Sequence, residues 1–205
     1  MDELAEFDRN VLDALRQSLE DGRINIARAA GHVQYPARVQ LIAAMNPCRC
    51  GNFGDAERAC RCPPMDPERY VRNVSGPLLD RLDLRIHMPR VPPEELIGGL
   101  AGEPSASVAA RIRSARVRAL ARNHGRPNAD LAGTALARAS GIARSDQRVL
   151  ADLAARDHMS ARGIHRVLRV ARTIADLDER EVVRADDLLA AAGLRDSVER
   201  TPLAA

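Results

Sequence analysis

The chain has 205 residues, a formal net charge of +3, 45% hydrophobic residues and 29% charged residues, a composition typical of one or two globular domains. Its apolar runs are too short to cross a membrane, and acidic residues occupy its start where a signal peptide would be cationic and then apolar. We therefore expect a cytoplasmic protein without a membrane partner. All 31 basic residues are arginine and Trp is absent, which excludes lysine chemistry and disfavours reading of single strands by aromatic stacking.

The first ninety residues have the pattern of an α/β domain. The expected elements are a helix over 8–20, strands over 24–28 and 33–39, a buried strand over 40–45, helices over 66–73 and 75–81, and a strand over 84–88. Asp8 is the predicted N-cap of the first helix and Gly22 its stop. Gly31 and His32 are the predicted turn between the first two strands.

The remainder is rich in Ala and Arg and has no convincing strand pattern. Residues 89–105 read as a linker with a short helix at most. The helices expected after it cover 106–123, 133–140, 145–156, 160–177 and 184–192, and Ser160 is the predicted N-cap of the fourth. We expect two domains, residues 1–92 and residues 93–205. The predicted fold class is α/β followed by an all-helical domain.

Four cysteines lie within fifteen residues, in the pattern C-x-C, nine residues, C-x-C. They are Cys48, Cys50, Cys60 and Cys62. Two short arms of one loop can bring four thiolates to a tetrahedral Zn²⁺ ion, and a site with four protein ligands is structural rather than catalytic. Two disulfides, four free thiols or another metal are the alternatives. Disulfides are disfavoured because nothing in the sequence indicates export.

An acidic pair, Asp2 and Glu3, precedes the first helix, and Asn46 follows the predicted buried strand. A P-loop ATPase shows this order in its second half. There the Asp holds the Mg²⁺ of bound ATP and the Glu orients or deprotonates the attacking water. On spacing alone, solvated charge is the simpler interpretation of such a pair.

Several segments, in this order, resemble the magnesium-chelatase-like AAA+ family, and more narrowly its ComM (YifB) branch. They are 1–22, which begins MDELAEFD; 44–51, AMNPCRCG; 75–84, SGPLLDRLDL; and 160–177, SARGIHRVLRVARTIADL. The resemblance covers the chain up to about residue 190. It implies that 1–92 is a partial P-loop AAA+ core and that the rest is the helical lid.

The resemblance also assigns roles to single residues. Asp2 and Glu3 fall on the Walker B acids and Asn46 on sensor 1. Arg81 falls on the arginine finger, which in such rings reaches the ATP of the neighbouring subunit and stabilises charge on the transferring phosphoryl group. Without this context, an arginine in so arginine-rich a chain is more simply a surface residue.

Two further features follow from the resemblance. Arg162 falls on sensor 2, where it would contact the γ-phosphate of its own subunit. Arg166 and Arg169, one and two turns along the same helix, could share or take that role. The strands within 23–39 fall where the family has a hairpin that faces the ring pore and touches DNA.

One departure from the family pattern changes the expected activity. The chain has no G-x-x-x-x-G-K-[ST] motif and no Lys, so it lacks the phosphate-binding loop that lies upstream of Walker B in the family. We expect a fragment of a longer protein, with a split-gene product that docks on a separate N-terminal half and a decayed remnant as alternatives. The chain should not hydrolyse ATP alone, but it could supply Arg81 to a neighbour.

The function that the resemblance implies for the full-length form is an ATP-dependent DNA helicase. Such a protein uses ATP and Mg²⁺, forms a homo-oligomeric ring, expected to be a hexamer, and acts on branched or single-stranded DNA in branch migration during natural transformation. One alternative is a non-enzymatic, zinc-stapled module that binds DNA or protein. Another is the ATPase subunit of a magnesium chelatase.

Overall fold

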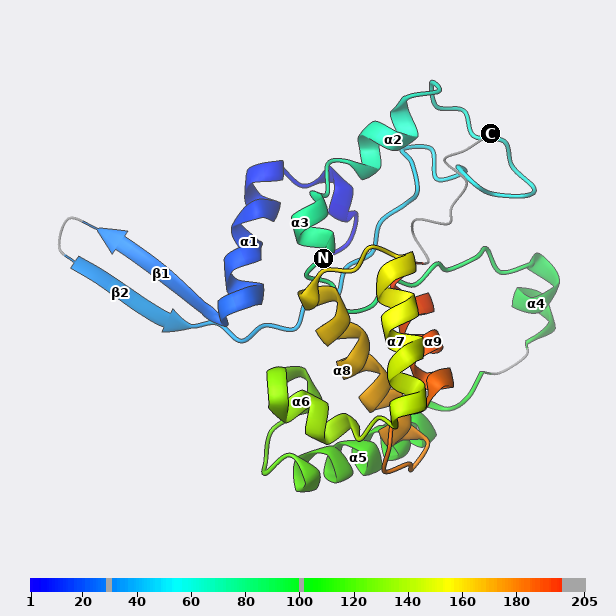
Figure 1. The fold of residues 1–205 in the computed structure, drawn as a ribbon. Coiled ribbons are helices and arrows are strands. Elements are labelled where there is room, and N and C mark those ends of the chain that lie inside the picture. Colours follow the sequence, from blue (N-terminus) through cyan, green and yellow to red (C-terminus); the bar gives the residue numbers. More distant parts are fainter. Residues whose placement is uncertain (29–30, 100–101, 197–205) are drawn as a thin grey trace. The chain divides into compact units, whose positions relative to one another are not determined.

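The computed structural model describes residues 1–28, 31–99 and 102–196 (Figure 1). The described chain divides into two compact units, one formed by Met1–Leu82 and the other by the residues from Asp83 onward. The division into functional domains at residues 92 and 93 stays a prediction.

The first unit begins with a short 3₁₀ helix, Leu4–Glu6, and helix α1, Arg9–Asp21. The predicted caps of α1 are confirmed. The side chain of Asp8 accepts a hydrogen bond from the backbone N–H of Asn10 at 2.8 Å. Gly22 takes a left-handed conformation with φ of 61°, and its N–H bonds to the carbonyl of Ser18, which ends the helix.

An antiparallel hairpin follows α1 directly. Strand β1, Arg23–Arg28, pairs with β2, Gly31–Pro36, and every residue of both strands is exposed. The hairpin extends from the end of α1, and its base is closed by a bond from the N–H of Ala37 to the carbonyl of Gly22 at 2.8 Å (Figure 1). The predicted turn at Gly31 and His32 was wrong, because both residues belong to β2 and pair with Arg28 and Ala27 of β1.

The predicted strands over 40–45 and 84–88 are not formed within the described residues. Instead, three backbone bonds join the start of the chain to the first of these segments. The amino group of Met1 donates to the carbonyl of Ile42 at 2.7 Å, Ala44 N–H to the carbonyl of Met1 at 2.9 Å, and Leu4 N–H to that of Ala44 at 2.9 Å. The first two bonds have the pattern of a parallel pair. One such pair of bonds is too short to form a strand ladder.

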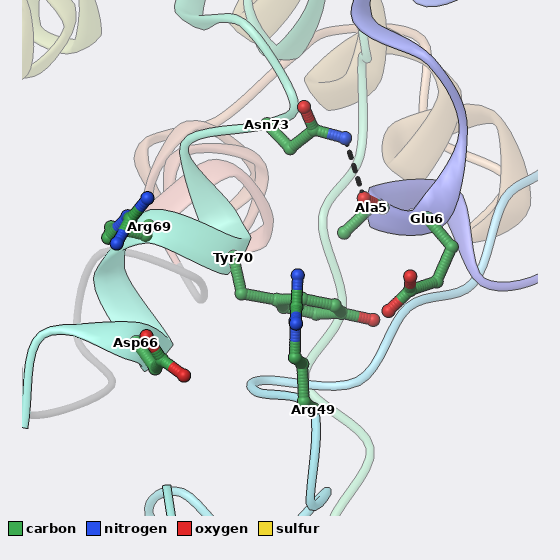
Figure 2. A pocket seen from close by; sticks show the side chains of 7 residues that line it. All are labelled: Ala5, Glu6, Arg49, Asp66, Arg69, Tyr70 and Asn73. Carbon is green, nitrogen blue, oxygen red and sulfur yellow. Dashed lines mark hydrogen bonds between the residues drawn. The ribbon is translucent and has the colours of Figure 1, made fainter. Parts of the chain in front are cut away.

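Two short helices, α2 (Asp66–Val71) and α3 (Gly76–Leu79), complete the first unit. They close a small core with α1 and the 3₁₀ helix. The fully or nearly buried members of this core are Leu4, Ala5, Leu12, Tyr70, Val74 and Leu78. Asn73 ties α2 to the start of the chain, because its side-chain amide donates to the carbonyl of Ala5 at 2.7 Å (Figure 2). The same amide donates to the carbonyl of Phe7 at 2.8 Å.

The second unit is helical throughout its described regular structure. Its helices are α4 (Pro93–Gly98), α5 (Ser105–Arg122), a 3₁₀ helix (Asn128–Asp130), α6 (Gly133–Ser140), α7 (Arg144–Arg156), α8 (Ala161–Leu177) and α9 (Ala185–Asp196). The five long helices expected from the sequence are confirmed. Ser160 caps α8 by accepting from the N–H of Gly163 at 3.2 Å. None of the described helices is long and apolar enough to span a membrane.

Helix α8 lies at the centre of the second unit (Figure 1). Its apolar stripe packs against α6 and α9, as the spacing of its Val, Leu and Ala residues predicts, and α7 joins the same core by packing against α9. The residues that are completely buried in this core are Leu136, Val167, Ala171, Ala175, Val183, Leu188 and Ala191. Apolar burial of this kind is the main source of stability for the helical unit.

A charged network is buried beside this core. Arg172 is fully buried and Asp176 is 1% exposed, and they pair at 3.0 Å. Arg122 on α5 makes two bonds to the same carboxylate, at 2.5 and 2.8 Å, and Asn128 makes a third at 2.8 Å. Arg172 also donates to the carbonyl of Glu181 at 2.6 Å. The carboxylate of Asp176 therefore joins α5, α8 and the 3₁₀ helix.

The substitution Asp176→Asn tests how far the unit depends on this carboxylate. It leaves two guanidinium groups without their counter-charge, so the free energy of unfolding should fall by about 3–5 kcal/mol. Urea denaturation followed by circular dichroism measures it. The matched control is Asp178→Asn, whose side chain is 58% exposed, and it should cost less than about 1 kcal/mol. Equal effects of the two substitutions would contradict a special role for Asp176.

The same carboxylate predicts a pH dependence. Burial acts to raise the pKa of Asp176, but hydrogen bonds from Arg122 and Asn128 and the charges of Arg172 and Arg122 outweigh it, so the pKa lies below its ordinary value. Its stabilising effect should be complete above the unfolded-state pKa of about 4 and be lost as the pH falls through the folded-state pKa. Asp176→Asn should therefore lose less stability than the wild type on acidification from about pH 5. Parallel pH curves for the two proteins would refute this.

Candidate functional site

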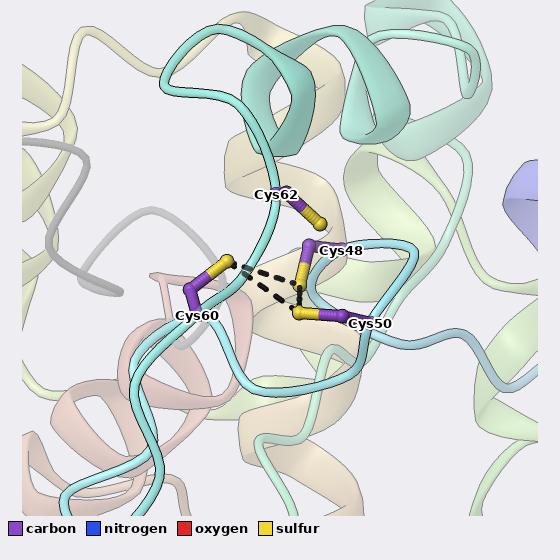
Figure 3. A group of neighbouring side chains, drawn as sticks. All are labelled: Cys48, Cys50, Cys60 and Cys62. Carbon is purple, nitrogen blue, oxygen red and sulfur yellow. Dashed lines mark hydrogen bonds between the residues drawn. The ribbon is translucent and has the colours of Figure 1, made fainter.

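The four cysteines of the 48–62 loop converge on one point (Figure 3). Their sulfur atoms all lie within 4.8 Å of one another. The Sγ of Cys48 is 3.4 Å from that of Cys50 and 3.7 Å from that of Cys60, and the last two are 3.6 Å apart. All four are free thiols in the structure.

These distances can be compared with the geometry of a zinc site. Four sulfurs at about 2.3 Å from a central ion form a tetrahedron with edges of about 3.8 Å. The three short separations are close to this edge, whereas a disulfide would need about 2.05 Å. The donor set therefore fits Zn²⁺, and Cys48, Cys50, Cys60 and Cys62 are the residues that would hold it.

The loop itself favours thiolate at one position. Gly51 and Gly54 adopt φ of 77° and 80°, which lets the chain fold back on itself. The backbone N–H groups of Arg61 and Asn52 hold the pKa of Cys50 down to about 6. For Cys60, the N–H of Cys62 acts to lower the pKa, but desolvation and the neighbouring sulfurs raise it to about 12. A cation at the centre would favour the loss of the remaining protons.

The acidic pair lies at the start of the first unit. Asp2 and Glu3 are exposed, and a carboxylate oxygen of Asp2 accepts the N–H of Glu3 at 2.9 Å. Glu3 has φ of 50°, an uncommon conformation outside glycine. The backbone bond from Leu4 to Ala44 brings this pair next to the segment that leads to Asn46, which is also exposed. The structure thus places the predicted Walker B and sensor 1 positions on neighbouring backbone segments.

Arg81 follows α3 in the same unit, and its side chain is 14% exposed. One guanidinium nitrogen donates to the carbonyl of Pro77 at 2.7 Å, and another pairs with the carboxylate of Glu20 on α1. Ser75, just before α3, donates to Asp13 of α1 at 2.8 Å and lowers the pKa of that carboxyl. Sequence reasoning did not single out Glu20, because its partner lies 61 residues away.

Arg162 belongs to the second unit, where it lies in the first turn of α8 and is exposed. The two arginines named as alternatives lie further along this helix. Arg166 and Arg169 both face Asp83, at 3.9 and 3.6 Å. Their side chains are 13% and 21% exposed. Of the three, Arg162 is the one whose side chain is presented to solvent at the start of the helix.

The first unit also has an open pocket of about 360 Å³ that the sequence analysis did not predict (Figure 2). Arg49 and Arg69 line it together with Glu6 and Asp66. Burial and the charge of Glu6 raise the pKa of Tyr70, which forms one wall. Its two cations and two anions balance, so the pocket has no evident preference for either sign of ligand.

Comparison with known proteins decides the family. Residues 1–96 match the family model described as magnesium chelatase, subunit ChlI, and residues 102–195 match the model for the C-terminal part of that subunit. The chain belongs to the magnesium-chelatase-like family, in its ComM branch. The resemblance inferred from the sequence motifs is thereby confirmed.

The relatives include proteins from several bacteria. The chain is 40% identical to competence protein ComM of Haemophilus influenzae and 38% identical to the protein YifB of Escherichia coli, in each case over 196 residues and 95% of this chain. It is 38% identical to the protein Mb2921c of Mycobacterium bovis over 203 residues and 98% of this chain. The chain spans 38–40% of the length of these relatives.

The cysteine cluster predicts a metal content that can be measured. The purified chain should carry about one zinc per molecule, and Cys48→Ser should remove it because the tetrahedral donor set is broken. Elemental analysis gives the stoichiometry. A chelator should also lower the unfolding temperature, since metal binding is coupled to folding of such loops.

Asn52→Ser is the matched control, since it alters the same loop but keeps all four thiols. It should retain the zinc. A well-folded, metal-free wild type with four titratable thiols would refute the zinc site and leave the free-thiol alternative. Thiols that react only after reduction would instead indicate two disulfides.

Proposed function

We propose that this chain is the Walker B-to-lid portion of a ComM-type AAA+ ATPase that drives DNA branch migration with ATP and Mg²⁺. The observation that carries the proposal is the 40% identity over 196 residues to competence protein ComM. Both magnesium-chelatase family models match along the chain, in the order of the core and the C-terminal part, and support the AAA+ assignment. In this proposal, residues 1–92 belong to the ATPase core and 93–205 form the helical lid.

The backbone pairing at the start of the chain supports the nucleotide-site assignments. Parallel neighbours present their carboxyl ends at the same edge of a sheet, where ligands bind in open α/β folds. The bonds of Met1 and Leu4 to the segment before Asn46 supply this arrangement for Asp2 and Glu3. In the proposed mechanism Asp2 holds the Mg²⁺ of bound ATP, Glu3 orients the attacking water, and Asn46 contacts that water or the γ-phosphate.

Two arginines complete the proposed site from different subunits. Arg162 contacts the γ-phosphate of its own subunit from the first turn of α8. Arg81 reaches the nucleotide of the neighbour, which requires a head-to-tail ring such as a hexamer. The 205-residue sequence contains no G-x-x-x-x-G-K-[ST] motif. In this proposal, the backbone N–H groups and the Lys that bind the phosphates are therefore supplied by a preceding segment or a separate chain.

The hairpin is the proposed DNA-contacting element. Strand β1 carries Arg23 and Arg28 at its two ends, and both strands are exposed along their whole length, so both cations are accessible to phosphates. The Haemophilus influenzae relative is named competence protein ComM, which supports the proposed role in natural transformation. The proposed Zn²⁺ is structural and braces the loop that follows Asn46.

The magnesium-chelatase ATPase subunit is the second candidate, because the matching family models carry that description. The cysteine loop favours the ComM-type function over it. A zinc-stapled binding module without ATPase activity is the third. Stimulation of ATP turnover by branched DNA supports the first, stimulation by the other chelatase subunits the second, and ATP-independent DNA binding by the isolated chain the third.

Arg81→Ala tests the proposed mechanism in the ATPase that carries this chain. Nucleotide binding should be largely unchanged, because the guanidinium serves the neighbour's site. Turnover should fall by about 10³-fold, since arginine fingers in related systems contribute about 10³–10⁵. Fluorescent-nucleotide titration and a coupled ATPase assay measure the two quantities.

The matched control is Arg113→Ala, an exposed arginine on α5. It should leave turnover within about twofold, since surface substitutions away from special features have small effects. Unchanged turnover in Arg81→Ala would place the finger elsewhere. Unchanged turnover in Glu3→Gln would contradict the Walker B assignment.

A further inference from the structure

Arg81 is held inside its own unit. Its guanidinium bonds to the carbonyl of Pro77 at 2.7 Å and pairs with Glu20, while its Nε is buried without a hydrogen-bond partner. The side chains of Arg81 and Glu20 are 14% and 32% exposed. The cation is therefore directed toward α1, with its charge compensated by a carboxylate of the same chain.

This arrangement competes with the proposed role of Arg81. A guanidinium that closes on Glu20 cannot at the same time reach a phosphate held by another subunit. The nucleotide of a neighbour and the carboxylate of Glu20 therefore compete for one cation, and the side chain has two alternative states. The ratio of these states depends on the strength of the pair with Glu20.

We propose that Glu20 is a positioning residue that holds Arg81 in cis and so regulates its transfer to the neighbour's nucleotide. The inference rests on the proposed function, in which Arg81 acts in trans. Glu20 itself does not touch nucleotide. Its carboxylate pairs with the Arg81 guanidinium when no nucleotide phosphate of a neighbour competes for that guanidinium.

The base of the hairpin provides a means of release. Glu20 lies in the last turn of α1, two residues before Gly22, and β1 begins at Arg23. The bond from Ala37 to Gly22 ties the returning strand to the same point. A force on the hairpin is therefore applied within two residues of Glu20, so DNA bound to the hairpin would shift the carboxylate and free Arg81.

Chemical labelling of Arg81 tests the hold directly in this chain. Phenylglyoxal reacts with accessible guanidinium groups, and mass spectrometry reports the rate at each arginine. The free energy of a partly exposed ion pair changes the ratio of Glu20-paired to unpaired Arg81 by about two- to fivefold. Glu20→Gln and Glu20→Ala should both raise the labelling rate of Arg81 by that factor and leave the rate of Arg113 unchanged.

The matched control is Glu68→Gln, which breaks another partly exposed ion pair of the same unit, with Arg72. It should not change the labelling of Arg81. Unchanged labelling of Arg81 in both Glu20 variants would overturn the proposal. An equal rise at Arg113 would indicate a generally loosened fold and would also count against it.

ATP turnover supplies the functional readout in the ATPase that carries this chain. Without DNA, Glu20→Gln should raise turnover by about two- to fivefold, and the stimulation by branched DNA should shrink by the same factor. A loss of structure would lower turnover instead, so the direction separates regulation from damage.

The failures of the two proposals are distinguishable. If Arg81→Ala abolishes turnover while Glu20→Gln leaves the DNA-free rate unchanged, the role of Arg81 as arginine finger is supported. The regulation of Arg81 by Glu20 is then refuted. If Arg81→Ala leaves turnover unchanged, the arginine-finger role of Arg81 is refuted, and so is its regulation by Glu20.

Discussion

The first unit depends on three backbone hydrogen bonds between its first four residues and residues 42–44. They bring the Asp2–Glu3 pair to the segment that continues into Asn46 and the cysteine loop. Asn73 adds two side-chain bonds to the same region. Through these contacts the chain joins its acidic start, its helices and its candidate metal loop around one small core. The proposed nucleotide chemistry requires this convergence, because each acid by itself is only an exposed charge.

The cysteine loop and the hairpin both lack a buried apolar core, and each depends on a different source of stability. The loop has little regular structure, but its four sulfurs lie at separations that suit one tetrahedral ion. A metal there would replace the apolar core that so short a loop cannot build. The hairpin has backbone pairing but no burial, so its strands expose both faces. An exposed two-stranded ribbon is marginally stable alone, and a binding partner is a physical reason to retain it.

The second unit depends on buried charge as well as on apolar packing. Asp176 accepts bonds from three different elements, and removing it would leave Arg172 and Arg122 uncompensated. A related pairing in the first unit, between Arg81 and Glu20, lies closer to the surface, which the proposed exchange of partners requires. Burial thus distinguishes the Asp176 network, whose charges cannot be replaced by water, from the pair that we propose as a switch.

The sequence by itself determined the helices, the caps at Asp8 and Ser160, the clustering of the cysteines and the family, because these depend on local periodicity and ordered motifs. It misplaced the hairpin turn, and it predicted strands over 40–45 and 84–88 that the described chain does not form, because strand formation requires a partner that local pattern cannot supply. Only the tertiary structure decided which side chains meet across long separations. The pairing of Glu20 with Arg81 and the sulfur geometry arise from chain folding, which brings together groups that no sequence spacing connects.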